Sequence, residues 1–207
     1  MAEALTKKAS KTVSIDCQIQ PAVRQCSWKC VEANIDEYDF GDDVGKVDYI
    51  LALDVIEHLK SPERLLTKLR KRFSRDCPEI VITTGNVAFL PMRVSLLFAG
   101  FHYGRRGILD MDHTRLFTFS SLARTLQLNG YEVISKRGIP APFPLAVGDG
   151  LLARFLLHIN CFLIKISKSI FSYQIALVAK PLPTLGHLLE DAFDARKQKL
   201  TTGNNES

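Results

Sequence analysis

The sequence lacks the cysteine patterns that mark disulfide-rich and zinc-binding proteins. Its five cysteines are Cys17, Cys26, Cys30, Cys77 and Cys161. An odd count with no CxxC pair argues against a disulfide framework, and Cys26 and Cys30 have no second ligand pair nearby to complete a zinc site. The first ten residues also lack the apolar stretch of a signal peptide. We therefore expect free thiols, no metal centre and a cytoplasmic location.

The chain also lacks a strong charge of either sign. Its 27 Lys and Arg residues against 22 Asp and Glu residues leave a net charge of +5, with the basic residues scattered. This balance does not predict a nucleic-acid partner. With 46% hydrophobic and 24% charged residues over 207 positions, the composition is that of one globular domain. We expect that domain to span residues 1–198, followed by a flexible tail at 199–207.

No hydrophobic run is long enough to cross a membrane. The most apolar stretch, "LLARFLLHINCFLIKISKSIF" (151–171), is interrupted by Arg154, His158, Lys165 and Lys168. A spanning helix needs roughly 18 or more residues almost free of charge. The stretch predicts a core or surface helix, and the alternative is a helix that makes peripheral contact with a membrane interface.

What the sequence does contain is a strand–helix–strand unit. The run "VDYILALD" (47–54) is apolar without alternation, as in a parallel strand covered on both faces. Ser61 is placed to cap the next helix, with Pro62 at its first position, and "EIVITT" (79–84) is a second buried strand. Two parallel strands require a crossover of this kind. Further strands are expected at 12–16, 30–36, 131–137 and 172–180.

The segments between these strands predict two larger insertions. Residues 87–118 are irregular and rich in Phe, Gly and Arg, with one helix near residue 95, and we interpret them as a lid or acceptor-binding segment. A helix follows, capped by Ser120 and stopped by Gly130. Residues 138–171 form an insertion before the last strand, and a short helix is expected within "PAVRQCS" (21–27).

Polar side chains follow several of the predicted strands at the point where each strand ends. They are Asp16, Asn34 to Asp36, Asp54 to His58, and Gly85 with Asn86. In open α/β sheets ligands bind beyond the carboxyl ends of parallel strands. An acid directly after a strand can accept two hydrogen bonds from a ribose diol, although an Asp there also commonly forms a turn.

Five stretches in this order carry a resemblance to a known family. They are "TVSIDCQ", "VEANIDE", "VDYILALDVIEHLKSPERLLTKL", "IVITTGNVAF" and "MDHTRLFTFSSLARTLQLNGYEV". Together they resemble the class I S-adenosylmethionine-dependent methyltransferases, over residues 2 to 180. The closest type is the bacterial group found beside or fused to glycosyltransferases. The resemblance implies a Rossmann-like three-layer α/β sandwich with a mostly parallel sheet, and S-adenosylmethionine as the cofactor.

The resemblance also implies roles for cofactor-binding residues. Asp16 would hold the cofactor ribose, and Asn34 and Ile35 would flank the adenine, with Asn34 standing where the family often has Asp. Leu53 and Asp54 would contact the methionine portion. Asp16, Asn34 and Asp54 are therefore expected to gather around one nucleoside-shaped hollow.

Residues of the reaction cleft are expected next to this hollow. Glu57 and His58 would face the cleft as catalytic residues, and they resemble, with Asp54, a cluster that binds a divalent ion in some relatives. The simpler interpretation is that both only satisfy the first helical turn. His113 is a candidate base, since imidazole can take a proton near neutral pH, unless it only anchors the lid. Asn86 and Arg115 are expected to bind substrate. Arg115 can pair with an anionic group of the substrate.

The sequence departs from the family at its beginning. Class I methyltransferases open with a strand and a glycine-rich loop, whereas Met1 falls where the first helix should already run. We therefore expect the first strand and the glycine loop to be missing, which would leave unpaired backbone at about 1–3 kcal/mol for each lost partner. The missing loop also predicts weak binding of the cofactor.

The function that these observations predict is methyl transfer to an oxygen or nitrogen nucleophile. The acceptor would be a small metabolite, a sugar or a lipid-linked glycan, with a glycosyltransferase as a potential partner. One alternative is a catalytically inactive remnant or binding module that lacks the glycine loop. A second alternative, a nicotinamide-linked reductase, could also use Asp16 to hold a ribose, but it needs a Tyr-x-x-x-Lys pair, which the sequence lacks.

Overall fold

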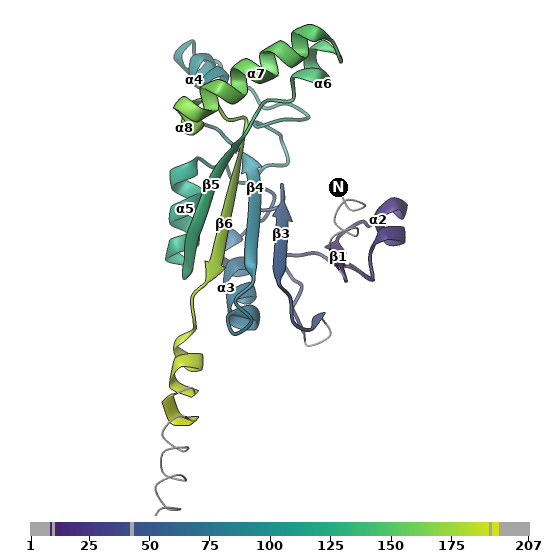
Figure 1. The fold of residues 1–207 in the computed structure, drawn as a ribbon, viewed down its shortest axis with the longest axis vertical. Helices are drawn as coiled ribbons and strands as arrows, with labels where there is room; N and C mark the ends of the chain where they lie inside the picture. Colours follow the sequence, from purple (N-terminus) through teal and green to yellow (C-terminus); the bar gives the residue numbers. More distant parts are fainter. Residues whose placement is uncertain (1–8, 10, 42–43, 191, 195–207) are drawn as a thin grey trace, which may run out of the picture. The chain divides into compact units, whose positions relative to one another are not determined.

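A computed structural model describes residue 9 and residues 11–41, 44–190 and 192–194 of the chain (Figure 1). It divides the protein into two compact units, Met1–Lys46 and Val47–Ser207, called unit 1 and unit 2 below. The tail expected at 199–207 lies outside the described residues. The single domain expected over residues 1–198 stays a prediction.

Unit 1 contains a pair of parallel strands. β1 (Val13–Asp16) and β2 (Lys29–Glu32) pair in the register Asp16↔Glu32 and are joined through the short helix α2 (Pro21–Cys26). Pro21 begins the helix because its missing N–H is not needed in the first turn. Arg24 in the last turn forms an ion pair with Glu32. The expected strand–helix–strand order is therefore confirmed here, with the second strand shorter than predicted.

Unit 2 contains a four-stranded sheet in the order β3-β4-β6-β5. The strands are β3 (Tyr49–Leu53), β4 (Glu79–Gly85), β5 (Tyr131–Ile139) and β6 (Gln174–Pro181). The sheet is mixed: β3, β4 and β5 run in one direction, and β6 runs antiparallel to its neighbours β4 and β5. The expectation of a mostly parallel sheet is therefore met in part. The reversed strand has a long-range cause: Asn86 N donates to Tyr173 O at 2.9 Å, so β6 begins where β4 ends and runs back along it.

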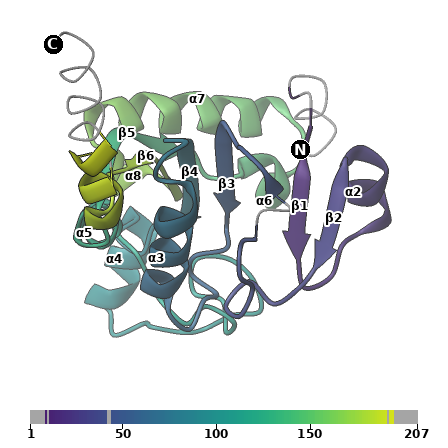
Figure 2. The same cartoon turned by 90° about the horizontal axis from the view of Figure 1, so that it is seen from below.

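Two amphipathic helices cover one face of this sheet (Figure 2). α3 (Pro62–Phe73) and α5 (Phe119–Leu128) bury their apolar residues against alternate residues of the strands. The resulting core includes Leu66, Ile80, Ile82, Phe117, Leu122, Leu126, Tyr131, Ile175 and Leu177. α3 and α5 both pack on this one face, and the three-layer arrangement expected from the sequence stays a prediction.

The exposure of β3 corrects a second expectation. Tyr49 is 64% exposed and Leu51 is 40% exposed, so the strand is not covered on both faces. The register explains this, because Ile50 pairs with the buried Ile80 while Leu51 pairs with Val81 on the opposite face. An apolar run without alternation therefore did not require two buried faces.

The helix ends agree with the sequence except at one cap. α3 begins at Pro62 with Ser61 at the N-cap, although the Ser61 side chain makes no capping hydrogen bond. α5 is capped by Thr118 rather than by the predicted Ser120, because Thr118 Oγ1 accepts from Ser121 N at 3.1 Å while Ser121 Oγ accepts from Thr118 N at 2.8 Å. This reciprocal pair satisfies two otherwise free donors.

Four further helices of unit 2 lie beyond the carboxyl ends of β3 and β4, at the top of Figure 1, whereas the helical residues 185–190 lie at the bottom. They are α4 (Leu90–Leu97), α6 (Phe143–Val147), α7 (Leu151–Ile166) and α8 (Lys168–Phe171). α4 falls in the segment expected to be a lid, and the other three fall in the insertion expected at 138–171. Among the described residues, none of the helices has the length and apolar content needed to pass through a bilayer.

Candidate functional site

The carboxyl end of β3 carries an exposed aspartate held in an uncommon backbone conformation. Asp54 follows Leu53 with φ 53°, a left-handed value that Asp tolerates better than most residues. Its N–H donates to Thr83 O at 3.2 Å, and Gln174 Nε2 donates to both of its carboxylate oxygens, at 3.1 and 2.9 Å. The neighbouring strands thus fix both the backbone and the carboxylate of Asp54.

Glu57, three residues later, is an acid in a nearly closed environment. It is 2% exposed, and its Oε2 has no hydrogen-bond partner. Burial raises the pKa of Glu57, and the negative charge of Asp54 adds to that effect, whereas a hydrogen bond from Thr84 and the proximity of His113 act against it. A desolvated carboxyl with an unpaired oxygen is unusual in a protein interior, and such groups concentrate at functional sites.

His58 and His113 lie against each other beside this carboxyl. Their ring centroids are 4.8 Å apart in an edge-to-face arrangement. Nδ1 of His113 lies 3.0 Å from Ile108 O, and Nδ1 of His58 lies 3.2 Å from Asp112 O. Because a carbonyl oxygen only accepts, each Nδ1 must carry the proton, which leaves each Nε2 as the proton acceptor of a neutral imidazole.

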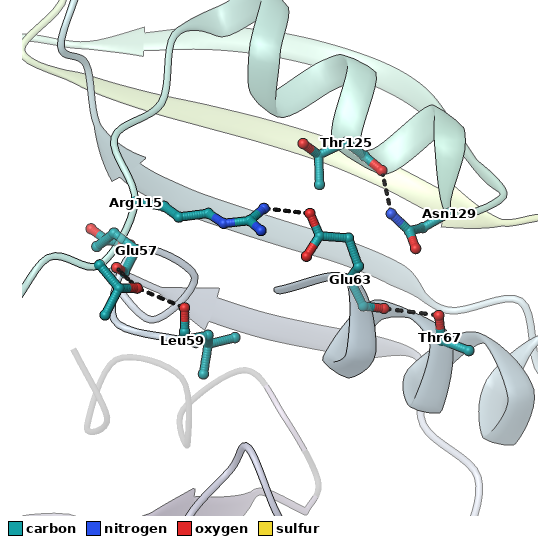
Figure 3. Close-up of polar contacts among 8 residues, drawn as sticks. Glu57, Leu59, Glu63, Thr67, Arg115, Thr125 and Asn129 are labelled. Atoms are coloured by element: carbon teal, nitrogen blue, oxygen red, sulfur yellow. Dashed lines mark hydrogen bonds and ion pairs between the residues drawn. The ribbon is translucent and has the colours of Figure 1, made fainter. Parts of the chain in front are cut away.

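Residues 108–115 are tied to the turn that carries Glu57. Thr114 N donates to Glu57 O at 2.8 Å, and Thr114 Oγ1 lies 3.0 Å from Glu57 O and 2.6 Å from Leu59 O. Figure 3 draws these bonds at the carbonyls of Glu57 and Leu59, with the guanidinium of Arg115 directed away from them toward Glu63. The histidine pair is therefore positioned by backbone contacts between two segments that lie far apart in the sequence.

Arg115, expected to bind substrate, is engaged within the protein. Its guanidinium forms an ion pair with Glu63 in the first turn of α3, and both side chains are about two-fifths exposed. This pair lowers the pKa of Glu63, although partial burial acts in the opposite direction (Figure 3). Arg115 thus has a structural partner, and its role in substrate binding stays a prediction.

Asn86, the other predicted substrate-binding residue, lies entirely inside the protein. It is 0% exposed, its Nδ2 donates to Ser169 O and Ser172 O at 3.0 and 2.9 Å, and its Oδ1 accepts from Ala88 N at 3.1 Å. In this structure the amide therefore joins the end of β4 to α8 and presents no polar atom at the surface. A direct substrate contact would require these bonds to change.

In unit 1 the predicted cofactor residues follow the ends of the two parallel strands. Asp16 ends β1, and its Oδ1 accepts from Gln18 N at 3.2 Å. Asn34 lies two residues beyond β2, where its Oδ1 accepts from Asp36 N at 3.1 Å. Both are exposed, and Ile35 next to them is half-buried. Since Asp54 belongs to unit 2, their gathering around one cofactor stays a prediction.

Several residues of the site were not foreseen from the sequence. Gln174 begins β6, 120 positions after Asp54, and Tyr173 directly precedes it. Burial and the charge of Asp54 raise the pKa of Tyr173. Thr83 donates from Oγ1 to Asp54 Oδ1 at 3.1 Å. Of these residues, only Thr83 had a sequence pattern that could have indicated its role. It belongs to the "TT" pair at the end of β4, and hydroxyl residues at the end of a buried strand suggest a polar neighbour.

A metal centre has no support in the described part of the chain. There, no group of three or more His, Cys, Asp or Glu side chains is arranged to hold a metal ion. Of the expected cluster, Glu57 is enclosed while Asp54 and His58 are exposed.

Comparisons with known proteins point in one direction. A family model described as "Methyltransferase domain" matches residues 1–136, about two thirds of the chain. A search of curated proteins finds no match. Among solved structures, 73 chains match.

Three solved structures illustrate the likeness in fold. A SAM-dependent methyltransferase from Thermotoga maritima gives a TM-score of 0.53 at 10% identity, covering 82% of this chain and 72% of that one. A chain from Listeria monocytogenes described as an S-adenosylmethionine-dependent methyltransferase gives 0.52 at 12% identity, covering 86% and 82%. The small RNA methyltransferase HEN1 gives 0.51 at 14% identity over 83% of this chain, which spans only 20% of that protein.

The donor groups of the structure fit the cofactor that this likeness implies. Exposed carboxylates at Asp16 and Asp54 can accept from the hydroxyl and ammonium groups of S-adenosylmethionine, and Asn34 offers an amide to the purine. The family model matches about two thirds of the chain, and the chain therefore belongs to the methyltransferase domain family.

Proposed function

We propose that the protein methylates an oxygen or nitrogen nucleophile, with His113 as the base that takes the proton of the acceptor. The observation that carries this proposal is the hydrogen bond from Nδ1 of His113 to Ile108 O, at 3.0 Å. It leaves Nε2 free to accept a proton, and the half-buried ring limits competition from water. S-adenosylmethionine supplies the electrophilic methyl group.

Glu57 supports this role by its position. His113 lies close enough to Glu57 for its proximity to act to lower the pKa of the carboxyl group. Burial has the larger effect on Glu57: it raises the pKa and so favours the neutral acid. Glu57 acts as a positioning residue, and the ring of His58 lies edge-to-face against the ring of His113.

The cofactor roles of the remaining residues are part of the same proposal. Asp54 and Leu53 would hold the methionine portion, Asp16 the ribose, and Asn34 with Ile35 the adenine. The fixed carboxylate of Asp54 supports this assignment, since a bond from Gln174 already orients it.

The acceptor is proposed to be a small metabolite, a sugar or a lipid-linked glycan. The motifs around His113 resemble those of methyltransferase units found beside glycosyltransferases, which supports a glycan and a glycosyltransferase partner. The mild net charge of +5 does not favour nucleic acid.

The test separates cofactor binding from catalysis. Calorimetry with S-adenosylmethionine should give binding for the wild type and a loss of at least tenfold in affinity for Asp54→Ala. Absence of heat from the wild type at millimolar cofactor would favour the alternative, an inactive remnant or binding module.

The catalytic role of His113 is tested with His113→Asn, whose side-chain amide can still donate to Ile108 O. With a panel of sugar and small-molecule acceptors, release of S-adenosylhomocysteine should fall about 10²- to 10⁴-fold. Cofactor affinity should stay within twofold, and the acid limb of the pH profile should disappear. His102→Asn, an exposed histidine outside this cluster, is the matched control. Equal losses in both variants would overturn the assignment.

A further inference from the structure

The helix α7 presents its large apolar side chains to solvent. Leu151, Leu152, Phe155, Phe162 and Ile166 are 61 to 86% exposed, and Ile159 is 40% exposed. At 3.6 residues per turn these positions fall within a single stripe about 100° wide.

The opposite side of α7 faces the protein with small and polar residues. Ala153 is 0% exposed and Asn160 is 6% exposed. Asn160 Oδ1 accepts from Ala141 N at 3.0 Å, and its Nδ2 donates to Phe171 O at 2.9 Å. The helix is therefore anchored by polar contacts on one side, while its apolar stripe has no cover among the described residues. Such a stripe marks an interaction surface.

Basic residues run along one flank of this stripe. Arg154 and Lys165 are exposed and eleven positions apart, so they project from nearly the same side of the helix, with His158 between them. No Asp or Glu occurs from Gly150 to Leu189. The surface is thus apolar and cationic together, with no acid in this part of the chain to offset the charge.

The short helix α8, which follows α7 in the chain, lines part of a cationic hollow of about 420 Å³. Its lining includes Arg93 of α4, Lys136 of β5 and Lys168 of α8, with the hydroxyls of Ser120 and Ser169. Lys168 Nζ donates to Lys136 O at 3.1 Å, so the two lysines lie side by side. Three cations with hydroxyl groups suit the phosphate of a lipid headgroup.

We propose that α7 docks on an anionic lipid bilayer, lying in the plane of the interface with its apolar stripe inserted and Arg154, Lys165 and Lys168 against phosphate groups. A helix that combines a strong apolar face with a cationic flank binds a membrane surface in this way. The charge complementarity selects this occupant, because a second copy of the same helix would bring its cations against each other. In Figure 1, α7 lies beyond the ends of β3 and β4, so docking would place the site of unit 2 beside the bilayer.

Flotation of the full chain with vesicles tests this proposal without any methyl-transfer assay. The wild type should float with phosphatidylcholine vesicles that contain phosphatidylglycerol, and at least tenfold less with phosphatidylcholine alone. Phe155→Ser combined with Phe162→Ser should reduce flotation at least tenfold. The matched control, Leu128→Ser with Leu185→Ser, removes two leucines that are 76 and 73% exposed elsewhere and should stay within twofold.

A second pair of variants tests the charges. Lys165→Gln with Lys168→Gln should reduce flotation about tenfold at low salt, whereas Lys60→Gln with Lys71→Gln should not. Circular dichroism should show the same unfolding midpoint for all variants.

Three outcomes would overturn the proposal. They are no flotation of the wild type on anionic vesicles, equal flotation of the phenylalanine variants, or a stable dimer in light scattering that the phenylalanine variants dissociate. The last result would mean that a second copy covers α7.

Discussion

The helices α5 and α7 are both amphipathic, yet they use their apolar faces in opposite ways. α5 buries Phe119, Leu122 and Leu126 against the sheet. α7 turns Phe155 and Phe162, among others, to solvent and buries an alanine and an asparagine. The periodicity of a sequence therefore locates an apolar face but does not say whether the protein itself covers that face.

The largest effect is expected at the buried face of α5. Leu122 is 0% exposed in the core, so Leu122→Ala should lower the free energy of unfolding by about 2–5 kcal/mol, through lost burial and the cavity left behind. Urea unfolding followed by circular dichroism measures this. Leu128→Ala on the exposed side of the same helix should change it by less than about 0.5 kcal/mol. Similar losses at both positions would contradict the assignment of the buried face.

A smaller loss is expected where α7 is anchored. Asn160→Ala removes hydrogen bonds to Ala141 N and Phe171 O, so it should cost about 1–3 kcal/mol and increase hydrogen exchange in α7. Asn129→Ala, which removes a single bond to Thr125 O at the end of α5, should cost less (Figure 3). If exchange in α7 stayed unchanged, packing rather than Asn160 would hold the helix.

Much of the fold could be predicted because local signals agree with the final structure. The strand–helix–strand unit is present as expected, with Pro62 at the start of α3. The end of α5 was also expected, because Gly130, with φ 79°, follows that helix. The direction of β6 could not be read locally, because it depends on how the insertion at 138–171 returns to the end of β4. The exposed face of β3 was not predicted for the same reason, because whether a strand face is buried depends on which other elements pack against it.

The site could be predicted only in part. The order of Asp54, Glu57 and His58 in the sequence placed them at a strand end, but burial separates them into one enclosed acid and two exposed groups. The contact of His58 with His113 joins segments 55 residues apart, and the bonds from Gln174 to Asp54 span 120 positions. No local pattern encodes contacts of that separation.

Glu57 differs from the apolar core residues of α5 because the group that it buries is a carboxyl group. Its raised pKa means that the folded state binds the proton more tightly than the unfolded state does. Stability relative to Glu57→Gln is therefore full below the ordinary pKa of 4.5 and is lost as pH rises through the raised pKa, at about 1.4 kcal/mol per unit of separation.

Unfolding measured from pH 4 to 8 tests this linkage. The wild type should lose stability relative to Glu57→Gln as the pH rises and then reach a constant difference. Glu190→Gln, an exposed acid that pairs with Arg75, should show no such decline. Parallel curves for the wild type and Glu57→Gln would mean that Glu57 ionises without the cost of burial.

The smallest effect on stability is expected at the stripe of α7. Phe155 is 62% exposed, so Phe155→Ala should change the free energy of unfolding by less than about 0.5 kcal/mol, although the same change in a core costs about 3–5 kcal/mol. Ala153→Leu, on the buried side of the same helix, should cost about 1–3 kcal/mol because a larger side chain has no space there. Urea unfolding of both variants decides between the two faces. A loss at Phe155 as large as the loss at Ala153 would mean that the protein itself covers the stripe, and the contrast between α5 and α7 would then disappear.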